Sequence, residues 1–101
     1  MSELKGSQRR FLKAQAHHLT PLVFVGKKGL TDELVAATDE ALDAHELIKI
    51  KFNDRKDEKR EIVAALVERT HSEEIGIIGN IAIVYRQQED EEKRRIELPE
   101  A

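Results

Sequence analysis

The sequence predicts an α/β domain with three helices and four strands in the order α-β-α-β-α-β-β. Apolar residues at helical spacing alternate along the chain with short apolar or alternating runs, the pattern of helices separated by strands. Gly79-Asn80 divides the last apolar segment in two, as the turn of a β-hairpin does. The length of 101 residues, 40% of them hydrophobic, suits one domain with one core. We expect this domain over residues 1–98, with residues 87–101 forming a partly mobile charged tail.

The first half of the chain predicts helix, strand and helix. Residues 7–18 have helical spacing, with Ser7 as the N-cap. Pro21 separates this helix from residues 22–25, and their wholly apolar sequence is typical of a strand that is buried on both faces or central in a sheet. Thr31 then begins a second helix that extends to about residue 45.

The second half predicts strand, helix and hairpin. Residues 47–52 alternate, with lysines on one face and Ile48, Ile50 and Phe52 on the other. The two strands flanking the second helix are expected to be parallel. A third helix over about 55–70 is capped by Asn53 or Asp54, and residues 75–86 form the hairpin. Apolar side chains at 96 and 98 are expected to dock the tail.

The stretch Val23-Phe24-Val25-Gly26-Lys27-Lys28-Gly29-Leu30-Thr31 carries the clearest functional signal. Glycines let a backbone approach another molecule closely, and a helix N-terminus offers free N–H groups and partial positive charge. With Lys27 and Lys28, the stretch therefore predicts a phosphate site; the alternative is an ordinary strand-to-helix turn. Asp32 and Glu33 compete with a phosphate for the helix N-terminus, so the lysines carry more of the attraction.

Charge is unevenly distributed, although the net charge is only −3. Residues 1–30 carry six lysines and arginines and one acid, whereas residues 31–46 carry six acids and neither lysine nor arginine. A basic side of this kind suits a polyanion, while chance clustering on a solvated surface is the alternative. Arg9, Arg10 and Lys13 share an outward face of the first helix. Arg86, at the end of the last strand, either reaches a phosphate or simply ends the strand, and the charges at 55–61 suit local pairing.

The sequence lacks the patterns that catalysis or cofactor binding needs. It has no cysteine, its four histidines have no metal-ligand spacing, and its serines lie in no nucleophile motif. No phosphate-binding loop of the nucleotide-hydrolase type and no dinucleotide fingerprint occurs. We therefore expect no enzyme activity, metal, cofactor or small-molecule substrate. No apolar run is long enough for a membrane span or a signal peptide, so we expect a cytoplasmic protein.

Three blocks of the chain resemble one family: His18 to Thr31, His45 to Lys51 and Ile78 to Arg86. The family is the CRM domain (chloroplast RNA splicing and ribosome maturation), in its single-domain bacterial YhbY-like form. The resemblance, over about residues 5–86, implies a compact two-layer domain with three helices packed on a four-stranded mixed sheet. It also implies similarity to the carboxy-terminal domain of translation initiation factor three.

By the same resemblance, the function is non-catalytic binding of ribosomal RNA in precursors of the large subunit. We expect the protein to be a monomer. The implied RNA-binding surface is Gly26, Lys27, Lys28 and Gly29, with Arg9, Arg10 and Lys13 beside it. Many relatives have lysine after the glycine of the third block, where this chain has Asn80, so one phosphate contact is expected to be missing. The acidic segments predict modest, salt-dependent affinity.

Two further expectations concern how a partner is recognised. Phe11, Phe24 and Phe52 have the pattern of core residues, which leaves Tyr85 as the one stacking candidate and favours recognition of RNA shape or backbone. The alternative function is a protein-interaction module, in which the acidic second helix docks on a basic partner such as a ribosomal protein.

Overall fold

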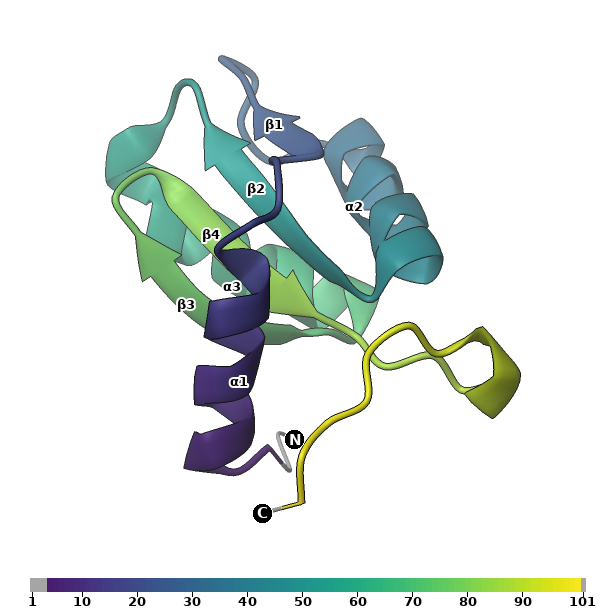
Figure 1. Cartoon of the computed structure of the whole chain (residues 1–101). Coiled ribbons are helices and arrows are strands. Elements are labelled where there is room, and N and C mark those ends of the chain that lie inside the picture. The colour runs from purple at the N-terminus through teal and green to yellow at the C-terminus, as the bar shows by residue number, and fades with distance from the viewer. Residues whose placement is uncertain (1–3, 101) are drawn as a thin grey trace.

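Three helices pack on a four-stranded mixed sheet in the computed structural model, which describes residues 4–100 (Figure 1). The strand order is β1-β2-β4-β3, with β1 parallel to β2 and the other pairs antiparallel. This confirms the predicted order of elements and the parallel pairing. The helices and strands are α1 (Gly6–Ala16), β1 (Val23–Val25), α2 (Asp32–His45), β2 (Leu47–Phe52), α3 (Lys59–Thr70), β3 (Glu73–Ile78) and β4 (Ile81–Tyr85), with 3-10 turns η1 (Lys56–Glu58) and η2 (Glu91–Lys93).

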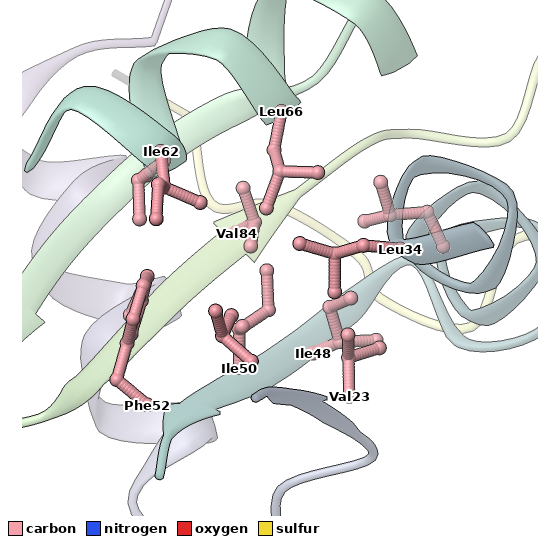
Figure 2. Packing of buried hydrophobic residues seen from close by; sticks show 12 residues of the cluster. Val23, Leu34, Ile48, Ile50, Phe52, Ile62, Leu66 and Val84 are labelled. Atoms are coloured by element: carbon pink, nitrogen blue, oxygen red, sulfur yellow. The ribbon is translucent and has the colours of Figure 1, made fainter. Parts of the chain in front are cut away.

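The helices are divided between the two faces of the sheet. Side chains of α2 and α3 pack on one face, where Leu34, Ile62 and Leu66 meet residues of β1, β2 and β4 (Figure 2). On the opposite face, Leu12 and Ala16 of α1 pack on a second cluster, formed by Leu47, Ile75, Ile83 and Tyr85. The expected packing of three helices on a four-stranded mixed sheet is confirmed. The sheet lies between two helical layers and not in the expected two-layer arrangement, because both of its faces carry apolar side chains.

Strand β1 lies at an edge of the sheet, not at its centre. Val23 and Val25 are buried against α2 and α3, whereas Phe24 between them points to the other face and is exposed. An apolar run is thus not proof of burial on both faces, because α1 packs on β2, β3 and β4 and leaves Phe24 of β1 uncovered. The prediction of a central strand at 22–25 is wrong.

The ends of the elements follow local hydrogen bonding. The Thr31 hydroxyl accepts a hydrogen bond from the N–H of Leu34 at 3.1 Å, which confirms that Thr31 begins α2. Helix α1 is capped at Lys5, not Ser7, and the Gln8 side chain accepts from the Lys5 N–H at 3.0 Å. Helix α3 begins at Lys59, later than predicted, because the Asp54 side chain accepts from the N–H of Arg55 and not from a helical residue.

The C-terminal tail is held by Glu46, which follows α2 and is fully buried. One of its carboxylate oxygens accepts from the N–H of Gln88 at 2.8 Å. The other accepts from the N–H groups of Arg95 at 2.6 Å and Ile96 at 2.9 Å. Ile96 and Leu98 pack against the α1 side of the sheet, as expected. The tail thereby returns alongside α1 (Figure 1).

Candidate nucleic-acid interface

The GKKG loop, residues 26–29, connects β1 to α2 at the upper end of the sheet (Figure 1). It is closed by a hydrogen bond from the Gly29 N–H to the Gly26 carbonyl at 3.0 Å. Gly29 has φ of +63°, a conformation that side chains other than glycine rarely adopt. Gly26 has no such constraint, and a Cβ atom there would meet nothing within 4 Å. Its backbone is open to an approaching molecule, and the side chains of Lys27 and Lys28 are exposed.

The connection between β2 and α3 supports this loop through hydrogen bonds to the backbone carbonyls of Lys27 and Val25. The Arg55 side chain donates through Nε to the Lys27 carbonyl at 2.7 Å, and its guanidinium pairs with Glu58 at 3.2 Å. The N–H groups of Asn53 and Asp54 both donate to the Val25 carbonyl. The Arg55–Glu58 pair confirms local pairing in this segment. The contact with Lys27 was not predicted, because it depends on β1 and β2 ending side by side.

The N-terminus of α2 offers a phosphate less than the sequence alone suggests. Thr31 already accepts from one of its free N–H groups. The Asp32 carboxylate pairs with Arg69 of α3 at 3.0 Å, so the negative charge expected to repel a phosphate is partly balanced. Glu33 lines an open groove of about 690 Å³, together with the loop and Phe24. Lys27 and Lys28 therefore supply the main attraction for an anion there.

A further lysine lies at the same end of the sheet. Strand β4 is antiparallel to β2, so the turn at Gly79–Asn80 lies at the end where β1 and β2 finish. The Lys59 ammonium group donates to the Gly79 carbonyl at 2.6 Å. Asn80 itself occupies the turn, where its carbonyl accepts from the Phe52 N–H. Lys59 thus places a positive charge beside the Gly79–Asn80 turn.

The three basic residues of α1 lie on the other face of the sheet from α2 and α3. The Arg9 guanidinium donates to the Glu74 carbonyl and pairs with Glu73, so it fastens α1 to β3. Lys13 extends over Gly76, where a Cβ atom would come within 2.8 Å of its Cε. Arg10 is exposed. The structure therefore directs Lys13 along the sheet and gives Arg9 a packing role.

Arg86 lies at the opposite end of the sheet from the GKKG loop, because β4 runs antiparallel to β2. Its guanidinium donates to the Asp39 carboxylate at 2.6 Å and to the Thr70 carbonyl at 2.8 Å. It thereby joins β4 to α2 and α3, and its side chain is only 22% exposed. The structure does not bring Arg86 together with the other predicted residues, and contact between Arg86 and RNA stays a prediction.

The structure reverses the assignments of two aromatic residues. Phe24 is 53% exposed, so its assignment to the core is wrong. Tyr85 is only 3% exposed, so it cannot serve as an exposed stacking surface as it stands. Burial raises the pKa of Tyr85 to about 12, and the nearby Glu46 carboxylate acts in the same direction. The lysines of β2 could have predicted the exposure of Phe24. Lys49 and Lys51 mark a face of the sheet that is open to solvent, and Phe24 pairs with Lys51 on that face.

The described part of the chain shows neither a metal centre nor a membrane span. Within residues 4–100, no group of three histidine, aspartate or glutamate side chains is arranged to hold a metal ion. No helix in the same range is both long enough and apolar enough to cross a membrane. What the site presents is an open glycine backbone, exposed ammonium groups and one aromatic ring.

Comparison with known proteins gives a consistent result. The family model described as the CRS1 / YhbY (CRM) domain matches residues 4–86. The chain is 41% identical over 97 residues to the "Probable RNA-binding protein YqeI" of Bacillus subtilis, covering 95% of this chain and 99% of the relative. It is 39% identical over 100 residues to the "RNA-binding protein" of Haemophilus influenzae, covering 98% of each. The solution structure of the hypothetical protein SAV1595 from Staphylococcus aureus is similar with a TM-score of 0.79 and 34% identity, covering 95% of this chain and 99% of that one.

Proposed function

This chain belongs to the CRS1 / YhbY (CRM) domain family, and we propose that it binds RNA through the GKKG loop. One observation carries the proposal: Gly26 has neither a positive φ nor a neighbour that would exclude a side chain. A glycine that its own fold does not need is explained by a ligand that approaches the backbone. The adjacent Lys27 and Lys28 favour an anion as that ligand, and the RNA-binding names of the relatives support RNA as the anion.

Recognition by this site is directed at the phosphate backbone. Backbone N–H groups and lysines hold phosphates without reading base sequence. The Arg55 side chain holds the Lys27 carbonyl by a hydrogen bond, so the loop keeps its shape before RNA binds. Less conformational freedom is therefore lost on binding. Arg10 and Lys13 of α1 add long-range attraction to the polyanion. The proposed function is binding without catalysis.

We further propose that the RNA is ribosomal and belongs to precursors of the large subunit, and that the protein acts in the cytoplasm as a monomer. The choice of ribosomal RNA rests on the resemblance of the three sequence blocks to the bacterial members of the family.

The alternative of an acidic docking helix gains little from the structure. Asp39, in the middle of α2, is paired with Arg86, and Asp32 is paired with Arg69. Glu46, the last acid of that segment, is buried and holds the tail. Several acidic side chains of this segment are thus paired within the domain, and we do not propose the acidic helix as the main partner surface.

Affinity for a large-subunit RNA fragment, measured over a range of salt concentrations, tests the proposal. The variant Lys27→Ala/Lys28→Ala is expected to bind more weakly, and its slope of log affinity against log salt is expected to fall by roughly 1.5 units for two lost phosphate contacts. The matched control is Lys93→Ala/Arg95→Ala, which removes the same charge from the tail, far from the loop (Figure 1). A small-subunit fragment of equal length tests the choice of RNA.

Two results would contradict the proposal. If the loop and tail variants lose affinity equally, general charge and not the GKKG loop binds RNA. If wild-type protein binds no RNA fragment even at low salt, the proposed function is wrong. Circular dichroism of each variant establishes that the fold is retained.

A further inference from the structure

One row of side chains crosses the open part of the sheet, with one residue from each strand. Phe24 of β1 pairs with Lys51 of β2, Lys51 pairs with Ile81 of β4, and Ile81 pairs with Ile78 of β3. Paired residues of a sheet point to the same face, so the four side chains lie on one surface. We name these four residues the open row.

The open row lies beyond the end of the surface that α1 covers. Helix α1 packs on Leu47, Ile83 and other residues farther along the strands, on the same face as the row. Phe24 is 53% exposed and Ile78 is 63% exposed, which makes them the two most exposed of the large hydrophobic residues in the described chain. These two side chains lie on the two edge strands of the same sheet face, at the two ends of the open row, and such exposed apolar side chains mark a surface for a partner.

The charge around the open row is positive. Lys51 belongs to the row, Lys49 lies on the same face one pair farther along, and Lys13 extends over Gly76 toward it from α1. Strands β1, β2 and β4 contain no acidic residue, and the two acids of β3 lie at its far end. A ligand that covers this surface therefore combines negative charge with a flat apolar part.

The surface also continues directly into the GKKG loop. Phe24 is two residues before Gly26, and it shares with Gly26, Lys27 and Lys28 the lining of the groove beside β1. An aromatic ring beside a basic loop offers the two kinds of contact that a nucleotide needs, one for its base and one for its phosphate. Base stacking on aromatic side chains, combined with a basic groove, is how proteins hold single-stranded nucleic acid.

We propose that the open row is a platform for single-stranded RNA, on which Phe24 stacks with one base while Lys51 and the GKKG loop hold the flanking phosphates. This inference rests on the proposed function, since it uses the same loop, and it adds a requirement for unpaired nucleotides. A base within a duplex cannot reach Phe24, because stacking on a side chain requires that base to leave its own stack. The protein should therefore prefer loops or single strands to a continuous helix.

The test uses full-length protein and a short single-stranded RNA that contains a fluorescent purine analogue, with a duplex of equal length as comparison. Phe24→Leu keeps an apolar strand residue but removes the aromatic face, and Phe24→Tyr keeps that face. Leu19→Ala is the matched control, because Leu19 is an exposed apolar side chain, 39% exposed, outside the row.

We expect Phe24→Leu to lower affinity for the single strand by roughly fivefold or more and to abolish the change in analogue fluorescence. Phe24→Tyr and Leu19→Ala should both behave like wild type. If Phe24→Leu binds and alters the fluorescence like wild type while Lys27→Ala/Lys28→Ala loses affinity, the platform is refuted and the proposed function stands. If the duplex binds as tightly as the single strand, or if Phe24→Leu changes only self-association of the protein, the platform is likewise refuted.

Discussion

Replacing Glu46 with glutamine should release the C-terminal tail. The substitution preserves the size of a fully buried side chain and removes only its charge and one acceptor. The amide oxygen can still accept from Arg95 and Ile96, but the amide nitrogen then faces the N–H of Gln88. Two donors would point at each other in a site closed to water.

The magnitude follows from these three hydrogen bonds. A hydrogen bond to a charged group contributes about 1.5–3 kcal/mol, and the one from Gln88 is lost outright. The remaining two become hydrogen bonds to a neutral acceptor and lose roughly half of their strength. These contributions add up to about 3–6 kcal/mol, and the loss that is observed cannot exceed the free energy with which the tail docks. Because the described part of the tail, residues 87–100, contains no strand and only one 3-10 turn, the tail should detach before the sheet unfolds.

Limited digestion with trypsin measures this detachment, since Lys93, Arg94 and Arg95 lie in the tail. Where opening is fast compared with cleavage, a loss of about 3 kcal/mol should speed cutting at these sites roughly 150-fold, and a larger loss should speed it further until the tail is fully detached. The matched control is Glu89→Gln, which removes a carboxylate from an exposed position of the same tail. If Glu46→Gln is cut no faster than this control and has the same urea midpoint as wild type, the reasoning is refuted.

Three further predictions follow from the contacts of single residues. Gly29→Ala should lower the free energy of unfolding by about 1–2 kcal/mol because the φ of Gly29 is positive. Gly26→Ala should leave the free energy of unfolding unchanged, because a Cβ atom there meets nothing within 4 Å. Equal urea midpoints for the two variants would contradict this prediction. Arg86→Met should cost about 2 kcal/mol through its lost bonds to Asp39 and neighbouring carbonyls, and a variant as stable as wild type in urea would show that this clamp is unimportant. Tyr85 has a pKa of about 12 in the folded protein and of 10 in the unfolded chain. As the pH rises, the unfolded chain therefore loses the tyrosine proton first. The free energy of unfolding should fall by about 2–3 kcal/mol between pH 10 and pH 12. Because the chain has one tyrosine, absorbance of the tyrosinate reports it directly, and the decline should be smaller in Tyr85→Phe.

The sequence by itself determined the elements and the loop. Apolar spacing predicted every helix and strand in order, because the periods of helix and strand are properties of a local stretch of chain. The two glycines and two lysines between residues 26 and 29 predicted a basic turn at the start of a helix, and Thr31 does cap that helix. Such features depend on neighbours within a few residues, and a sequence displays those directly.

Only the tertiary structure decided which side chains face outward and which distant partners they meet. Phe24 has the same apolar character as Val23 and Val25, yet it is exposed because β1 is an edge strand and α1 ends short of it. Glu46 belongs to an acidic segment, yet it is buried because the tail brings backbone N–H groups to it from more than 40 residues away. Strand order and helix placement set these environments, and both depend on contacts between segments far apart in the chain.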